Sequence, residues 1–235
     1  MLHRPMIAQN VDTIRRRIAA ACQRVGRDPG DVTLVAVTKT VDSIRVREAV
    51  DAGVLDLGEN FVQELLKKRQ DLLPAHIRWH FIGHLQSNKV KHIVDWVHLV
   101  HSVDSLSLGS ELSRRAATAG RRVEVLIEVN STGESAKFGV RPEDLPALAG
   151  QLRRLPNLAI TGLMTVGPFL PDPESSRPAF RLMRSLRERL AGEGPPLPHL
   201  SMGMTHDFEV AIEEGATMVR IGTAIFGPRA KAGNN

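Results

Sequence analysis

Lys39 is the side chain in this sequence with the clearest capacity for covalent chemistry. Of the 31 basic residues, seven are lysine and 24 are arginine, and Lys39 directly follows the apolar run 33–38. An amine can lose its proton and attack a carbonyl carbon, whereas a guanidinium stays charged. A lysine at the end of an apolar strand is therefore a candidate nucleophile for a carbonyl ligand.

Short apolar runs alternate with amphipathic stretches along the chain. We expect strands at 32–38, 54–57, 78–82, 97–101, 123–129, 159–166, 199–202 and 218–221, and helices at 43–52, 61–72, 106–119, 142–155, 174–190 and 207–214. This alternation predicts parallel βαβ units, and 235 residues suffice for one (β/α)8 TIM barrel. The segment 9–25 is predicted as an extra N-terminal helix, and residues 1–235 as a single domain.

The runner-up architecture is a doubly wound open sheet. Such a sheet normally carries a glycine-rich turn after its first strand. Here the chain reads Thr38-Lys39-Thr40-Val41 at that point. The barrel is therefore favoured.

Polar and small residues follow the predicted strands in an ordered way. Catalytic and binding groups of such barrels lie where strands end. Lys39 follows the first predicted strand, whereas the segments 201–205 and 222–223 at the last two strands are rich in glycine and hydroxyl groups. Backbone N–H groups at those last strands commonly hold a phosphate. The ligand should thus carry a carbonyl and a phosphate, as pyridoxal 5′-phosphate (PLP) does, or a phosphorylated sugar in a Schiff-base aldolase.

Several motifs resemble those of a known family, and this resemblance favours one of these two ligands. They lie at 35–40, 58–64, 79–89, 101–104, 162–165, 201–205 and 219–223. Together they resemble the pyridoxal phosphate homeostasis protein family, which is similar to the barrel domain of bacterial alanine racemase. The resemblance implies an alanine racemase N-terminal-domain-like barrel that binds PLP.

The resemblance also implies six cofactor-binding residues, which are Lys39, Asn60, Ser201, Arg220, Gly222 and Thr223. Lys39 would form the covalent aldimine, and Arg220 would face the pyridine nitrogen. Ser201, Gly222 and Thr223 would hold the phosphate, with Asn60 near the lysine end of the ring.

Several of these residues also have a structural interpretation. Ser201 could merely belong to the turn into the predicted helix 207–214. Asn60 is a suitable N-cap for the predicted helix 61–72. Arg220 could instead pair with a buried carboxylate such as Glu128.

The resemblance favours cofactor storage, buffering and delivery to PLP-dependent apo-enzymes over catalysis. The racemase uses a tyrosine from a second domain as a base and packs a histidine on the ring. This chain has no tyrosine, and its segment 133–139 has no histidine. A charged Arg220 beside the ring nitrogen also weakens the cofactor as an electron sink. The alternative is a PLP-dependent amino-acid racemase or lyase.

Composition restricts the partners and the compartment. The net charge of +5 could suggest nucleic acid, but the arginines are spread over several predicted helices and aromatic residues form only 4% of the chain. The single cysteine fits a reducing compartment, and no apolar run is long enough to span a membrane. We therefore expect a cytoplasmic protein without nucleic-acid or membrane partners. The resemblance, without the partner-forming second domain of the racemase, implies a monomer. His80 with His84, and His98 with His101, lack the further ligands of a zinc site, so no metal is expected.

Overall fold

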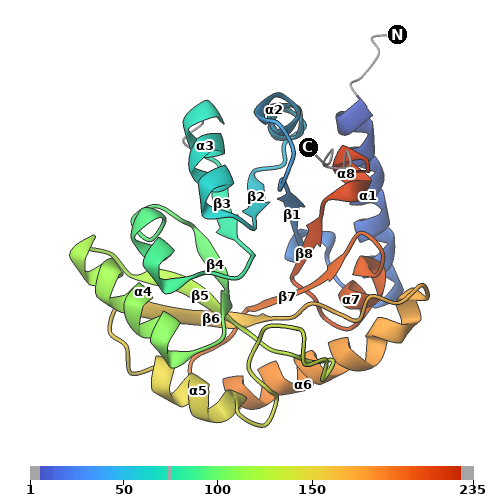
Figure 1. Ribbon diagram of the computed structural model, residues 1–235. Coiled ribbons are helices and arrows are strands. Elements are labelled where there is room, and N and C mark those ends of the chain that lie inside the picture. Colours follow the sequence, from blue (N-terminus) through green and yellow to red (C-terminus); the bar gives the residue numbers. More distant parts are fainter. Residues whose placement is uncertain (1–5, 73–75, 229–235) are drawn as a thin grey trace.

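The strands close into a parallel barrel, as Figure 1 shows in ribbon form. The computed structural model describes residues 6–72 and 76–228. The strands follow one another in chain order, and β8 pairs with β1. Their bounds are β1 (Thr33–Val37), β2 (Asp56–Glu59), β3 (Arg78–Phe81), β4 (Leu99–Val103), β5 (Val123–Glu128), β6 (Leu158–Met164), β7 (His199–Met204) and β8 (Met218–Ile221). The predicted (β/α)8 barrel is thus confirmed.

Helices surround the barrel in chain order (Figure 1). They are α1 (Met6–Arg24), α2 (Ser43–Asp51), α3 (Val62–Leu72), α4 (Leu106–Thr118), α5 (Leu145–Leu152), α6 (Arg177–Gly192), α7 (Phe208–Glu213) and α8 (Thr223–Phe226). Short 3-10 helices occupy Pro29–Asp31 (η1), Ser87–His92 (η2) and Pro173–Ser176 (η3). Between β3 and β4, η2 takes the place of an α-helix.

The extra N-terminal helix is confirmed as α1. Its buried residues Ile7, Val11, Ile14 and Ile18 recur every three or four positions, which places them on one helical face. That face packs against α7, α8 and α2.

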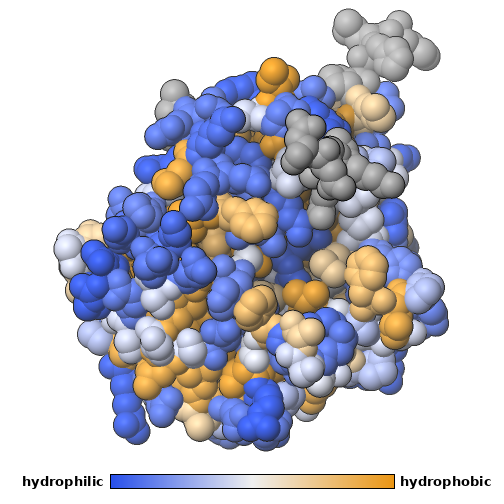
Figure 2. Space-filling model, in the orientation of Figure 1, coloured by the Kyte–Doolittle hydropathy of each residue, from blue (hydrophilic) through white to orange (hydrophobic). Residues whose placement is uncertain are grey.

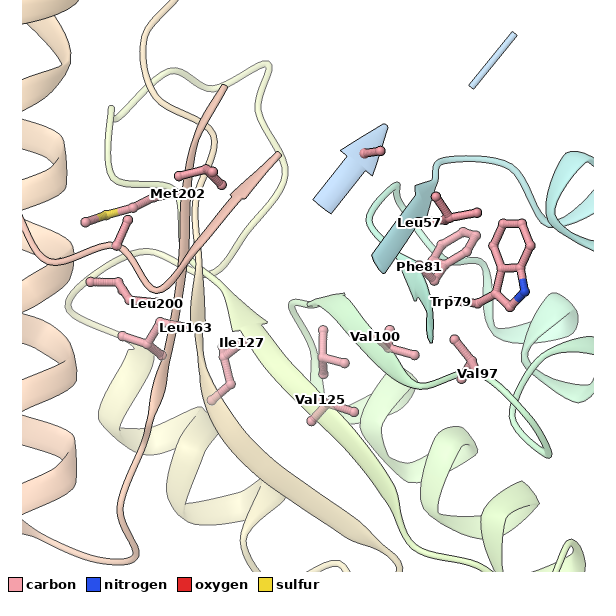
Figure 3. Packing of buried hydrophobic residues seen from close by; sticks show 14 of the residues in the cluster. Leu57, Trp79, Phe81, Val97, Val100, Val125, Ile127, Leu163, Leu200 and Met202 are labelled. Atoms are coloured by element: carbon pink, nitrogen blue, oxygen red, sulfur yellow. The ribbon is translucent and has the colours of Figure 1, made fainter. Parts of the chain in front are cut away.

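Apolar side chains form two separate layers. Most of them pack between the strands and the helices, and Figure 3 shows part of this outer layer around Leu57, Phe81, Val100, Val125 and Ile127. A smaller cluster, made of Val35, Leu99, Leu126, Met164 and Met218, fills the interior of the barrel. Because successive strand residues point to opposite faces, inward positions recur every second residue. Polar residues at these inward positions must share the interior with the smaller cluster.

Two predicted strands lie two residues later than expected. β2 covers Asp56–Glu59 instead of 54–57, and β4 covers Leu99–Val103 instead of 97–101. The apolar runs that suggested the earlier bounds begin before the ladder pairing does. Gly58, which we expected in a loop, is part of β2, and a Cβ atom there would lie 3.0 Å from side-chain carbons of both Val35 and Ile82. The glycine therefore leaves interior space to its neighbours.

Candidate cofactor-binding site

The six predicted cofactor residues come from four consecutive strands of the closed barrel, β7, β8, β1 and β2. Lys39 follows the end of β1, Asn60 directly follows β2, and Gly222 directly follows β8. Ser201 and Arg220 lie within β7 and β8. Since parallel strands end at one face of a barrel, the structure brings the residues to one sector of that face.

Helix α3 fixes the backbone on both sides of Lys39. Lys68 Nζ donates a hydrogen bond to the carbonyl oxygen of Thr38 at 2.5 Å, and the Thr40 N–H donates to Glu64 Oε2 at 2.8 Å. Thr40 has a φ of 62°, in the left-handed region that a β-branched residue rarely adopts. These contacts hold a strained turn immediately beside the half-buried Lys39.

A buried carboxylate joins the Lys39 segment to Asn60. Glu59 is fully buried, and its Oε1 accepts hydrogen bonds from Thr38 Oγ1 at 2.6 Å and from Lys68 Nζ. Its Oε2 accepts from the Asn60 N–H at 3.2 Å. Burial raises the pKa of Glu59, whereas the hydrogen bonds from Lys68 and Thr38 oppose that rise. The ion pair of Glu59 with Lys68 therefore helps to position two of the predicted cofactor-binding residues, Lys39 and Asn60.

The side-chain oxygen of Asn60 is buried and has no hydrogen-bond partner within the described residues. Asn60 lines a pocket of about 350 Å³ together with Phe61, Gln63, His84 and Lys89. Leaving a buried acceptor unsatisfied costs about 1–3 kcal/mol, and such an orphan calls for an explanation. A polar ligand group provides one.

The N-cap interpretation of Asn60 is wrong. Helix α3 begins at Val62, one residue later than the cap would require. The Asn60 oxygen accepts no bond from the N–H groups of the helix. Its side chain is thus available to a ligand.

Arg220 is buried in the barrel and held at both terminal nitrogens. Nη1 donates to Ser201 Oγ at 2.6 Å, and Nη2 donates to the carbonyl oxygen of Thr165 at 2.7 Å. Burial lowers the pKa of Arg220 to about 10, against the opposing charges of Glu128 and Asp207. The guanidinium therefore stays charged at neutral pH.

The alternative partner of Arg220, Glu128, acts on it only through its charge. Among the described residues, no ion pair within 4.0 Å joins them. Burial and the charge of Asp104 raise the pKa of Glu128 to about 7, although Arg220 opposes that rise.

The Ser201 hydroxyl already has two side-chain partners inside the barrel. The residue is fully buried, and its hydroxyl contacts Arg220 Nη1 and, at 3.0 Å, His101 Nδ1. Its hydroxyl thus supports Arg220, and any contact with a phosphate would have to compete with these two bonds.

Helix α8 begins where a phosphate was predicted. The Gly222 carbonyl accepts hydrogen bonds from the N–H groups of Ile225 and Phe226, at 2.9 Å each. The first N–H groups of a helical turn have no carbonyl partner within it. Those of Thr223 and Ala224 can therefore bind an anion, as such groups do in phosphate sites.

Replacing Glu128 should change the pH dependence of folding. The folded protein favours the neutral form of the Glu128 carboxyl, because the pKa rises from 4.5 in the unfolded chain to about 7 in the fold. The free energy of unfolding therefore falls as the pH rises from 4.5 through 7. The difference corresponds to about 3 kcal/mol. We expect the Glu128→Gln variant without ligand to match the wild type at pH 4 and to exceed its free energy of unfolding above pH 7, measured in urea. An equal difference at both pH values would contradict this.

The sequence analysis considered His80 and His101 only as zinc ligands, and it did not single out Lys68. His80 and His101 are fully buried inside the barrel, where they hydrogen-bond to each other. Lys68 is buried on α3, three residues after Leu65 and four before Leu72, both also buried. Two sequence signals could have indicated them. The histidines occupy inward strand positions, and Lys68 lies on the apolar face of a helix.

A second pocket, of about 470 Å³, lies at the opposite end of the barrel. Its lining includes Arg15 of α1 and the first residues of three strands, Thr33, Asp56 and Arg78. None of the six predicted residues lines it. Because binding groups of (β/α)8 barrels lie at the other end, we assign the site to the face of Lys39 and Asn60.

Comparison with known proteins adds independent evidence. The family model of the alanine racemase N-terminal domain matches residues 9–230. The pyridoxal phosphate homeostasis protein of Aquifex aeolicus is 48% identical over 222 residues, which cover 94% of this chain and 97% of the relative. The protein of the same name from Pseudomonas aeruginosa is 46% identical over 224 residues, with 95% and 96% covered.

Solved structures agree with the fold. PipY of Synechococcus elongatus PCC7942, with PLP bound, superimposes with a TM-score of 0.82 at 35% identity and covers 94% of this chain and 100% of its own. Alanine racemase of Clostridium difficile 630 gives a TM-score of 0.75 at 15% identity, covering 96% of this chain and 57% of its own. This more distant likeness shows the barrel fold alone.

Proposed function

Because this chain belongs to the alanine racemase N-terminal domain family, and within it to the pyridoxal phosphate homeostasis proteins, we propose that it holds PLP covalently on Lys39 and serves PLP homeostasis. The observation that carries the proposal is the grouping of Lys39, Asn60, Arg220 and Gly222 on neighbouring strands of one barrel. PipY, a 35%-identical protein of the same fold, has been solved with PLP bound.

The residues present fit such a cofactor. PLP supplies an aldehyde that an amine can attack and a ring that withdraws electrons. Lys39 is the amine. The Asn60 oxygen, which has no hydrogen-bond partner among the described residues, is a buried acceptor directly after the adjacent strand β2. The N–H groups of Thr223 and Ala224, which follow Gly222 at the start of α8, hold the phosphate.

Arg220 determines the hydrogen bonding and the protonation state of the pyridine nitrogen of PLP. A guanidinium donates hydrogen bonds and accepts none, so the atom that it meets must be an acceptor. It also disfavours protonation of that nitrogen by charge repulsion. The site therefore binds the cofactor while promoting carbanion chemistry only weakly, which suits a carrier.

Ser201 takes a revised role in this proposal. We expected its side chain on the phosphate, but its hydroxyl is committed to Arg220 and His101. We assign the phosphate to Gly222 and Thr223 and let Ser201 orient Arg220.

Delivery of the cofactor tests the homeostasis role. The PLP-loaded protein, freed of unbound PLP by gel filtration, is mixed with a PLP-dependent apo-enzyme whose activity reports cofactor uptake. We expect the loaded protein to restore activity, and the same protein treated first with borohydride to restore none because its cofactor is fixed. Failure of both samples would contradict delivery, and rapid racemisation or cleavage of amino acids by the loaded protein would favour the racemase or lyase alternative.

We also propose a cytoplasmic monomer that binds neither nucleic acid nor membranes. A closed barrel leaves no strand edge for pairing between subunits. Arginines of α1 and α6 pair with carboxylates of α7, as in Arg17 with Glu209 and Arg177 with Glu213, which reduces the charge left for phosphates. In the described part of the chain, no helix is both long and apolar enough to cross a bilayer. Sedimentation velocity at several concentrations checks the oligomeric state.

A further inference from the structure

A continuous chain of side chains crosses the interior of the barrel and ends at Arg220. Arg220 Nη1 donates to Ser201 Oγ at 2.6 Å, and Ser201 Oγ lies 3.0 Å from His101 Nδ1. His101 Nε2 lies 2.9 Å from His80 Nδ1, and His80 Nε2 lies 2.9 Å from Asp56 Oδ1. None of the five residues is more than 6% exposed. The chain therefore runs from β8 through β7, β4 and β3 to β2, and its Asp56 end borders the pocket at the opposite end of the barrel.

The strand register explains why these residues meet. Arg220 and Asp56 both pair with Val35, a member of the interior cluster. His80 pairs with Leu99, and Ser201 pairs with Met164 and Met218, which belong to the same cluster. Partners across a parallel ladder share a face of the sheet. The polar residues thus occupy positions that a barrel normally fills with apolar side chains.

The two ends of the chain determine its direction. Arg220 can only donate, and Asp56, when ionised, can only accept. Burial alone would raise the pKa of Asp56, but hydrogen bonds from His80 and Arg78 outweigh it and lower the pKa to about 2. Asp56 is thus ionised at neutral pH, and His80 must donate to it from Nε2.

One proton arrangement then satisfies every member with both imidazoles neutral. His80 Nδ1 accepts from His101 Nε2, and His101 Nδ1 accepts from the Ser201 hydroxyl. Burial, together with the charge of Arg220, lowers the pKa of His101 well below its usual value, which agrees with a neutral ring. Ser201 is left with its oxygen lone pairs for the Arg220 N–H group.

The chain fixes the plane of the guanidinium. Ser201 holds Nη1 and the Thr165 carbonyl holds Nη2, so the described hydrogen bonds use two of the five N–H groups of Arg220. The Thr165 hydroxyl is itself bonded to the carbonyl oxygen of Val129 at 2.7 Å. The remaining N–H groups of Arg220 are thus presented in one orientation.

We propose that Asp56, His80, His101 and Ser201 are positioning residues for Arg220, acting as one polarised hydrogen-bond chain that orients its free N–H groups toward the PLP ring nitrogen. This inference rests on the proposed function. It assigns a role in cofactor binding to Asp56, which lies four hydrogen bonds away from Arg220. Each link transmits orientation only while the next link is intact.

A set of variants tests the chain by PLP titration, followed through the visible absorption band. Ser201→Ala and His101→Leu each remove a link of the chain, whereas Asp56→Asn removes the charge that fixes its direction, because an amide can both accept and donate. Each variant should weaken PLP affinity about tenfold and shift the band. His101→Gln should keep near wild-type affinity, because its amide can accept from Ser201 and donate to His80. If His101→Gln lost as much PLP affinity as His101→Leu, the proposed hydrogen-bond chain would be contradicted, because the imidazole ring of His101 and not its hydrogen bonds would be what matters.

Arg78→Gln is the matched control at the far end. Arg78 is bonded to Asp56 but lies outside the chain, with its side chain 48% exposed. Its replacement removes one of the two donors that keep Asp56 ionised but leaves His80 bonded to Asp56, so PLP affinity and the absorption band should change much less than in Asp56→Asn. A loss as large as that of Asp56→Asn would show that Asp56 acts through the general stability of that end of the barrel.

A double-mutant cycle makes the decisive comparison. Once Ser201→Ala has cut the chain beside Arg220, adding Asp56→Asn should cause no further loss of PLP affinity, even if it lowers the melting temperature further. Equal losses in both backgrounds, or no loss from Ser201→Ala in a protein shown to be folded by circular dichroism, would overturn the proposal. Borohydride labelling of Lys39 in each variant keeps the two claims apart, since its absence from the wild type would instead defeat the proposed function.

Discussion

Lys39→Ala is expected to abolish covalent binding of PLP and to weaken total affinity by about 100-fold or more, equivalent to about 3 kcal/mol. Lys68 on α3 is not placed to substitute, because it donates hydrogen bonds to Thr38, Glu59 and Glu64. Absorption titration with PLP measures the loss.

Two further variants separate charge from nucleophilicity at this position. Lys39→Arg keeps the positive charge but cannot attack an aldehyde, so it should lose the band as completely as Lys39→Ala does. Lys89→Ala removes a lysine that lines the pocket beside Asn60 and should retain the band. A band that survived in Lys39→Arg and vanished in Lys89→Ala would move the covalent site to Lys89.

Lys68→Met should cause the largest loss of stability among single substitutions near the site. Glu59 is fully buried and Lys68 is 4% exposed, so the variant leaves a buried carboxylate without its cation. Removing one partner of a buried ion pair typically costs about 3–5 kcal/mol. Urea unfolding of the ligand-free protein at pH 7 measures the change.

The neighbouring Lys67 provides the control for this prediction. It is exposed on the same helix, and Lys67→Met should alter the free energy of unfolding by no more than about 0.5 kcal/mol. The double variant Glu59→Gln with Lys68→Met should recover part of the loss, because it no longer buries a lone charge. Equal stability of the two lysine variants would show that the ion pair contributes little.

Much of the fold could be predicted because strand and helix periods differ clearly in this chain. The β-branched run before Lys39 and the alternating helical segments were enough to predict a closed parallel barrel. The bounds of β2 and β4 were less accessible. Val54 and Val97 are buried like strand residues but precede the ladder, and only the pairing of Asp56 with Arg78 and of His80 with Leu99 shows where these strands begin.

The predicted site depended on motifs that lie next to strand ends, where sequence position and spatial position coincide. Lys39, Asn60 and Gly222 were accessible in this way. The chain from Asp56 to Arg220 was not, because its members are 19 to 100 residues apart along each link. Its contacts depend on barrel closure and register, which no local pattern specifies.

The surface around the site, over which the cofactor would be delivered, carries exposed aromatic side chains. Exposed Phe61, Phe138 and Phe169 all belong to segments that follow strands at the end of the barrel that carries Lys39. Phe138 stacks on His84 with ring centroids 4.0 Å apart. Figure 2 shows apolar residues interspersed with hydrophilic ones across the middle of the face in view. The entrance to the site therefore combines apolar and polar groups.

Borohydride reduction followed by peptide mapping tests the central claim most directly. The wild-type protein is loaded with PLP, reduced, digested, and analysed by mass spectrometry beside Lys39→Ala. The account predicts one stoichiometric pyridoxyl phosphate adduct on the peptide that contains Lys39, and none in the variant. An adduct on another lysine, or a wild-type protein that remains unlabelled at saturating PLP, would contradict it.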